Sequence, residues 1–139
     1  MNAGRVFWRM TFILLLVAGG ALLAAGQSAP SLRPVTVFAE GDSSVIPKFI
    51  NVCRHMGPER GLDFKFVDKQ SDRYDYRVVL SAEGSGMWNY AQGNIVVLNP
   101  EAKVLFTVTR SNRWTAKGAT NALTKEFVKV LARYLDTHQ

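Results

Sequence analysis

The residue types best suited to nucleophilic catalysis are a thiol and an imidazole, and Cys53 and His55 bring both into one segment. The two stand two positions apart in a stretch with helical periodicity, where side chains at i and i+2 point to different sides. The other histidine, His138, is one residue from the C-terminus, where order is least expected. We therefore expect a buried Cys53, a surface His55 and no Cys–His catalytic pair.

Metal sites have little support in the sequence. One cysteine and two histidines lack the paired spacing of a zinc site, and the aspartates between Asp63 and Asp75 lack the glycine and the terminal glutamate of a calcium loop. We expect no metal ion and no cofactor. A hydrolase with paired carboxylates stays open, because carboxylates on different strands can meet in a folded chain.

A basic segment, Arg-Ser-Asn-Arg-Trp-Thr-Ala-Lys at 110–117, precedes the last expected helix. A helix N-terminus attracts anions through its free N–H groups and its dipole, so a phosphate or carboxylate of an envelope polymer is one candidate ligand. The candidate residues are Arg110, Arg113, Trp114 and Lys117. In the structural alternative, Trp114 packs against the sheet edge and Thr115 caps the helix.

A second segment, Met-Trp-Asn-Tyr at 87–90, places Trp88 and Tyr90 in a glycine-rich connection. If exposed, these rings could stack on a sugar or bind a protein partner. If buried, they complete the core. Both interpretations stay open.

Hydrophobic periodicity predicts the elements that position these residues. We expect strands at 35–39, 62–66, 74–82, 93–98 and 103–109, and helices at 46–56 and 116–138. Ser44 is the expected cap of the first helix, and the short turn at 99–102 predicts an antiparallel hairpin. These elements predict an α+β fold, a two-layer sandwich in which two helices cover one face of a mostly antiparallel sheet of about five strands, in the order β-α-β-β-β-β-α.

The N-terminal segment has the features of a secretory signal. Arg5 and Arg9 precede an apolar run at 10–25, and small residues follow at 24–26. A membrane-spanning helix needs about 20 apolar residues, which favours cleavage before Gln27 over a retained anchor. We expect a signal peptide at 1–26, a flexible leader at 27–34 and a single domain at 35–139.

Removing residues 1–26 leaves 113 residues with a net charge of +4 instead of +6. The single cysteine excludes an intramolecular disulfide, so an exported domain must rely on its core. A modest charge and an exported location argue against nucleic acid as a partner. We expect a periplasmic or secreted protein.

The closing stretch, Glu-Ala-Lys-Val-Leu-Phe at 101–106 and Arg-Trp-Thr-Ala-Lys-Gly-Ala-Thr at 113–120 with a helix to Leu135, resembles the amino-terminal domain of TolB and small exported bacterial envelope proteins. The resemblance covers element order over 35–135 and transfers no site residue. We expect a non-catalytic binding or assembly module of the bacterial envelope, with a protein or envelope polymer as its partner. The alternatives are a small secreted hydrolase, or a membrane-anchored accessory subunit if the N-terminal segment is retained.

The first prediction concerns processing. We expect the chain purified from its native host to begin at Gln27, because Ala24 and Gly26 place small side chains at both recognition positions of a signal peptidase. Intact-mass measurement of the purified chain tests this. A chain that still begins at Met1 would contradict cleavage and support the anchored alternative.

Overall fold

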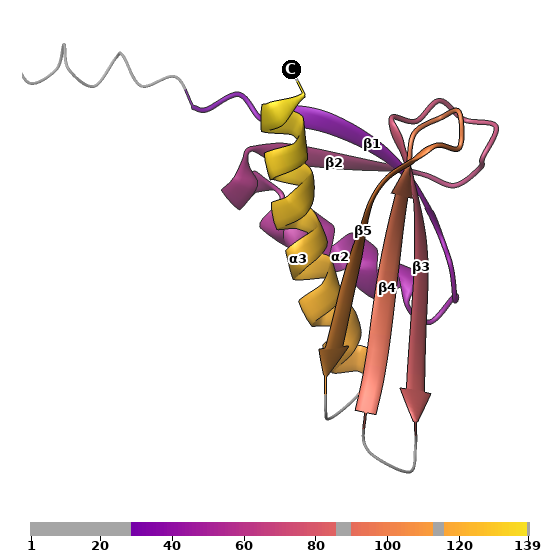
Figure 1. The fold of residues 1–139 in the computed structure, drawn as a ribbon. Coiled ribbons are helices and arrows are strands. Elements are labelled where there is room, and N and C mark those ends of the chain that lie inside the picture. The colour runs from indigo at the N-terminus through magenta and orange to yellow at the C-terminus, as the bar shows by residue number, and fades with distance from the viewer. Residues whose placement is uncertain (1–28, 86–89, 113–115, 139) are drawn as a thin grey trace, which may run out of the picture. The chain divides into compact units, whose positions relative to one another are not determined.

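A computed structural model describes residues 29–85, 90–112 and 116–138. Its helices and strands lie within one compact unit, Leu32–Gln139. In chain order they are β1 (Arg33–Glu40), α2 (Ile46–Met56), the short 3-10 helix η1 (Pro58–Arg60), β2 (Leu62–Val67), β3 (Tyr76–Ser85), β4 (Tyr90–Leu98), β5 (Val104–Asn112) and α3 (Ala116–Thr137) (Figure 1). The predicted α+β class and the order β-α-β-β-β-β-α are confirmed.

The five strands form a mixed sheet in the order β2-β1-β3-β4-β5. β1 runs parallel to both β2 and β3, whereas β3–β4 and β4–β5 are antiparallel. The sheet is thus more evenly mixed than the mostly antiparallel one expected. The reason is that α2 connects β1 to β2 as a crossover, which makes those strands parallel. The chain then passes to the other side of β1, so β3 pairs with β1 and not with β2.

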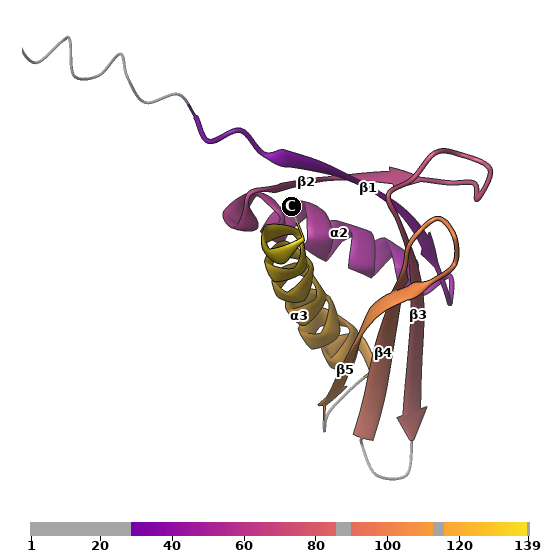
Figure 2. The ribbon, with the colours of Figure 1, turned by 45° about the horizontal axis from the view of Figure 1, so that its top comes forward.

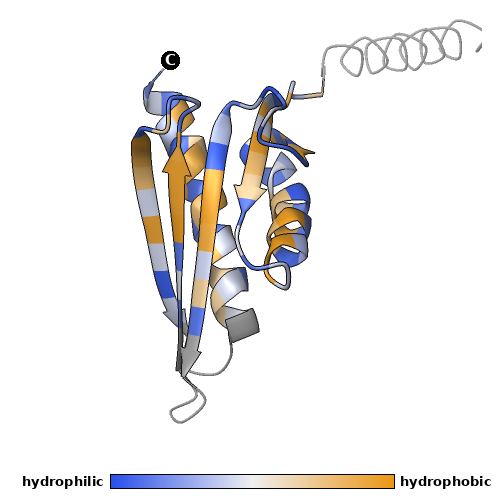
Figure 3. Ribbon diagram, turned by 90° about the vertical axis from the view of Figure 1, so that its right-hand side faces the viewer, coloured by the Kyte–Doolittle hydropathy of each residue, from blue (hydrophilic) through white to orange (hydrophobic). Residues whose placement is uncertain are grey.

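Both helices pack on the same face of the sheet, as Figures 1 and 2 show together. Alternate residues of the strands point toward the helices, which produces the alternating hydropathy of the strands in Figure 3. The largest fully buried side chains come from both layers: Val35, Val37, Phe49, Val78, Ile95, Val97, Leu123, Phe127 and Leu131. The two-layer arrangement of the core is the one predicted from periodicity.

An aromatic cluster joins the two helices to the sheet. The ring centroid of Phe127 in α3 lies 5.3 Å from that of Phe49 in α2 and 6.2 Å from that of Phe64 in β2. One turn earlier in α3, Leu123 is so close to Gly93 of β4 that a Cβ added to the glycine would lie 2.8 Å from the leucine Cδ2. These contacts fix both the position of α3 and its rotation about its own axis.

The start of α2 differs from the prediction. Its N-cap residue is Val45, which makes no side-chain cap hydrogen bond, so Ser44 is not the cap. Instead the Ser44 backbone N–H donates to the Asp42 carboxylate at 2.7 Å, and this bond lowers the pKa of Asp42. Asp42 is therefore the residue that orders the turn before the helix. The predicted end of α2 is confirmed, because Gly57 is its C-cap and donates its N–H to the Cys53 carbonyl at 2.8 Å.

Two further boundaries differ. β1 begins at Arg33, within the segment predicted to be a flexible leader. Tyr74 precedes β3 and its ring lies 5.8 Å from that of Phe38, so it does not continue the buried face that Val78 and Leu80 form. The predicted hairpin is confirmed, with the N–H of Ala102 donating to the Asn99 carbonyl at 3.0 Å.

The predicted burial of Cys53 is confirmed. Its exposed fraction is 0%, and desolvation raises the pKa of its thiol well above the ordinary value. His55, two residues away, is exposed. The two side chains therefore lie in different environments, and Cys53 acts as a small apolar residue of the core.

We expect Cys53→Ala to lower the free energy of unfolding by about 1–2 kcal/mol, because it removes buried volume. His55→Ala is the matched control and should change it by less than about 0.5 kcal/mol. Urea unfolding measures both. Thiol labelling of the folded protein should be slow, since a protonated, buried thiol is a poor nucleophile. Rapid labelling under native conditions would refute the core assignment.

Candidate binding site

The predicted binding residues are only partly within the described structure. The side chain of Arg110, on β5, is described. Tyr90 opens β4 and Lys117 lies in the first turn of α3, but the structure describes these two by their backbone alone. The others lie outside the described residues: Trp88, Arg113, Trp114 and the expected cap Thr115.

The sheet brings the described flanks of the two predicted segments to one end. Ser85 at the end of β3 pairs with Tyr90 at the start of β4, and the next residue, Ala91, pairs with Asn112 at the end of β5. The flanks of 86–89 and 113–115 are therefore neighbours in the fold (Figure 1). The sequence could not show this, because it depends on the strand order.

Arg110 faces α3, since it is paired with the helix-covered Gly93. Its Nη2 lies 3.0 Å from Oε2 of Glu126. The same carboxylate lies 3.9 Å from the Lys129 ammonium and 3.6 Å from the Arg133 guanidinium. The hydrogen bond from Arg110 is the main cause that lowers the pKa of Glu126. An internal carboxylate thus already occupies the position that an external anion would take at Arg110.

β5 forms one edge of the sheet, since it pairs with β4 alone among the described strands. The pairing shifts at Val97/Leu98, where β5 has one extra residue, Leu105, and the regular ladder then runs from Phe106 to Asn112. A bulge limits how far an edge can be extended, so this seven-residue stretch is the usable edge. The opposite edge, β2, is shorter and carries the exposed charges of Asp63 and Lys65.

A shallow hollow lies beside this edge, and we call it the β5–α3 groove. Its volume is about 230 Å³, and its lining residues are Phe106, Val130, Arg133, Tyr134 and Thr137. The rings of Phe106 and Tyr134 are 5.5 Å apart, and Tyr134 also stacks on His138 at 4.2 Å. The groove is therefore lined by a packed pair of aromatic rings and the cationic Arg133, next to an open strand edge.

The sequence pattern missed this groove. Val130 and Tyr134 belong to the apolar stripe of α3, and both are only partly buried. The width of that stripe could have indicated the groove. A helix that covers a sheet needs an apolar face of about 100°, and a wider face leaves apolar side chains outside the interface with the sheet. Phe106 could be placed beside it only once the β4–β5 register was known.

Within 29–85, 90–112 and 116–138, no three His, Cys, Asp or Glu side chains gather as metal ligands. Among these same residues, each buried side-chain nitrogen or oxygen has a hydrogen-bond partner. No helix of the described chain combines the length and the apolar character that crossing a membrane requires.

The Glu126 cluster predicts a pH-dependent stability. The folded-state pKa of Glu126 lies below its ordinary value of 4.5, so its contribution is complete above that pH and is lost as the pH falls through the folded-state pKa. We expect Glu126→Gln to cost about 0.5–1 kcal/mol at neutral pH, because the ion pairs are near the surface. The cost should vanish in acid.

Urea unfolding at neutral and acidic pH measures this difference. Glu101→Gln is the control, since Glu101 is exposed and makes no ion pair with a described residue. A cost for Glu126→Gln that is equal at both pH values would contradict the electrostatic explanation.

No protein-family model and no curated protein matches this chain.

Proposed function

We propose that this chain is an exported, non-catalytic binding module of the bacterial envelope that binds an extended segment of a partner protein along β5. The observation that carries the proposal is the coincidence of an open strand edge with an apolar groove directly beside it. Proteins that bind peptides by strand addition use this combination. Backbone hydrogen bonds along the edge supply affinity, and pockets for alternate side chains supply specificity.

The dimensions of the edge support this mode. Seven residues of β5 form a regular ladder with β4. A strand added to β5 would place every second side chain over the helix-covered side. There an apolar side chain would lie in the groove against the packed rings of Phe106 and Tyr134 and displace water from them.

The charges around the groove favour an acidic partner segment. Arg133 lines the groove and its side chain is 72% exposed, so its guanidinium can reach an acidic residue of the partner. Such cations at an interface rim act mainly on orientation and association rate. An acidic residue next to the apolar anchor would therefore fix the register of the added strand.

Two described carboxyl groups are unsuited to the acid role of the hydrolase alternative. A carboxylic acid that protonates a leaving group needs a raised pKa. The two described carboxyls with shifted values, Asp42 and Glu126, are both lowered, because a backbone N–H and an arginine stabilise their charged forms. The thiol of Cys53 is equally unsuited, since it is fully buried and its pKa is raised.

Two observations support the export part of the proposal. Arg5 and Arg9 before the apolar run at 10–25 are typical of a secretory signal. The single thiol is completely buried, so it is protected from mispairing in an oxidising compartment. The resemblance in element order to the TolB amino-terminal domain agrees with an envelope location.

We expect Thr137→Trp to weaken partner binding, because an indole at this exposed lining position fills the groove. The matched control is Lys125→Trp, which puts the same ring on an exposed position of α3 away from the groove. The chain as purified from its host is immobilised and incubated with envelope extract, and bound proteins are quantified and cross-linked. Recovery of the partner should fall roughly tenfold with Thr137→Trp and stay unchanged with Lys125→Trp.

The cross-links should join one extended segment of the partner to β5. Equal recovery with both variants would refute the groove as the binding site. Cross-links confined to the sheet face opposite the helices would do the same.

A further inference from the structure

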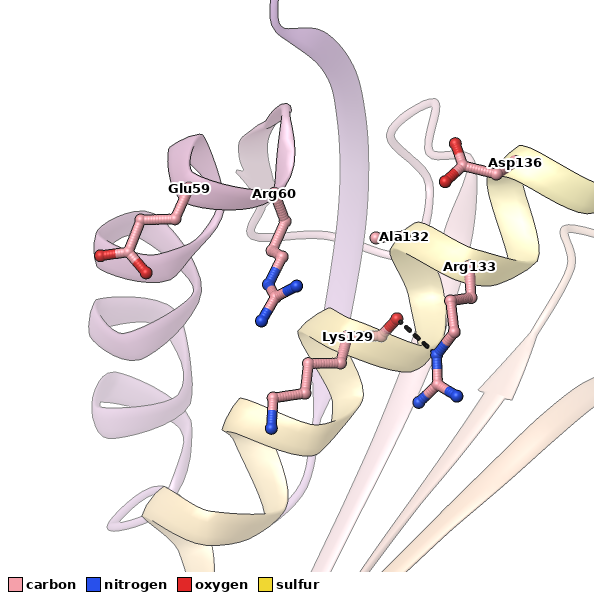
Figure 4. A pocket seen from close by; sticks show the side chains of 6 residues that line it. All are labelled: Glu59, Arg60, Lys129, Ala132, Arg133 and Asp136. Atoms are coloured by element: carbon pink, nitrogen blue, oxygen red, sulfur yellow. Dashed lines mark hydrogen bonds between the residues drawn. The ribbon is translucent and has the colours of Figure 1, made fainter.

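A second hollow, the η1–α3 pocket, lies between η1 and α3 (Figure 4). Its volume is about 500 Å³, and its lining residues are Glu59, Arg60, Lys129, Ala132, Arg133 and Asp136. Ala132 presents a small side chain, which leaves room above the helix. The proposed partner-binding function does not use this pocket.

Cationic groups from two elements share the pocket. Arg60 projects from η1 toward α3, and Lys129 projects from α3 on the same side, so that both head groups lie in the space between the two elements (Figure 4). Arg133 folds back along α3, where its Nε is 3.4 Å from the Lys129 carbonyl. Three cationic head groups thus line one pocket, held there by η1 and α3.

The carboxylates of the pocket do not neutralise these groups. Those of Glu59 and Asp136 lie apart from the head groups of Arg60 and Lys129 (Figure 4). Asp136 instead lies 3.8 Å from the Arg33 guanidinium. Arg60 has no carboxylate within ion-pair distance in the described part of the chain. Its positive charge is therefore available to a ligand.

The charges of this region leave a positive surplus. The cations are Arg33, Arg60, Arg110, Lys129 and Arg133, and the carboxylates in contact with them or lining the pocket are Glu59, Glu126 and Asp136. The surplus of two positive charges matches the charge of a phosphate monoester, about −1.5 to −2 at neutral pH. A carboxylate would neutralise half of it.

We propose that the η1–α3 pocket binds a phosphate group, carried either by an anionic lipid headgroup or by a soluble phosphate. The guanidinium of Arg60 offers parallel N–H donors that suit two phosphate oxygens, and the Lys129 ammonium supplies a point charge to a third. Arg133 closes the rim. Glu126 lies within ion-pair distance of Lys129 and Arg133 and competes with the ligand for both.

The test is an NMR titration of the chain purified from its host with inorganic phosphate, compared with chloride at equal ionic strength. We expect saturable shifts at Arg60 and Lys129 with phosphate alone. Arg60→Gln should weaken binding roughly five- to tenfold, since it removes a charge-assisted bidentate contact. Glu126→Gln should strengthen it several-fold, because Lys129 and Arg133 lose their internal partner.

Lys103→Gln removes one exposed positive charge away from the pocket and is the matched control. It should leave the affinity for phosphate unchanged. Equal losses with Arg60→Gln and Lys103→Gln, or equal shifts with chloride, would overturn the proposal. The spectra themselves report whether each variant is folded.

Co-sedimentation with vesicles distinguishes the two sources of the phosphate group. Vesicles of phosphatidylcholine with phosphatidic acid, whose headgroup is a phosphate monoester, are compared with vesicles of phosphatidylcholine alone. Binding to the former that is lost with Arg60→Gln and kept with Lys103→Gln assigns the pocket to a lipid headgroup. Phosphate binding with no such vesicle binding assigns it to a soluble phosphate. The site would be overturned if Arg60→Gln and Lys103→Gln reduced vesicle binding equally and phosphate produced no saturable shifts in the NMR titration.

Discussion

The contact of Phe127 with Phe49 and Phe64 determines how the rest of the molecule can be used. It joins α3 to α2 and β2, two elements much earlier in the chain, and it fixes the rotation of α3 against the sheet. Once Phe127 faces inward, the 3.6-residue period places Val130 and Tyr134 toward β5 and Lys129 and Arg133 toward solvent. The β5–α3 groove and the η1–α3 pocket thus both follow from the packing of Phe127.

The position of β1 has a similar effect on the edges of the sheet. Because β1 is parallel to β2 and to β3, the crossover through α2 covers that half of the sheet, and the hairpins extend the other half outward to β5. β5 then ends the sheet beside α3 with no further strand among the described residues. A sheet with an open edge exposes unpaired backbone groups, which a protein must either protect or use. The bulge at Leu105 shortens this edge without closing it.

The sequence alone predicted what depends on local pattern. The helical period of 46–56 placed Cys53 in the core, and the short turn at 99–102 predicted the hairpin. The residue that orders the turn before α2 was harder to predict, since Asp42 and Ser44 are both good capping residues. Only the geometry shows that the Asp42 carboxylate accepts the hydrogen bond from the Ser44 N–H. The strand order could not be predicted, because it depends on which strands share a core. The partner of Arg110 was missed for that reason, as Glu126 is reached only across the β5–α3 packing.

Arg60 was missed for a different reason. Pro58-Glu59-Arg60 has the composition of an ordinary charged turn, and nothing in it indicates a ligand. Its significance comes from the approach of η1 to α3, a contact between segments about seventy residues apart. Local sequence can supply the charge, but the fold decides whether that charge is isolated or part of a site.

Arg133 lines both proposed sites, and this constrains how they can act together. Its guanidinium can approach an acidic residue in the groove or a phosphate in the pocket, while Glu126 holds it at 3.6 Å when neither is bound. A ligand that ties Arg133 to one side removes it from the other. Because coupling between two binding equilibria is reciprocal, each ligand must weaken the other by the same factor. If both proposed ligands bind, the β5–α3 groove and the η1–α3 pocket are therefore coupled through Arg133, for which Glu126 competes with both ligands.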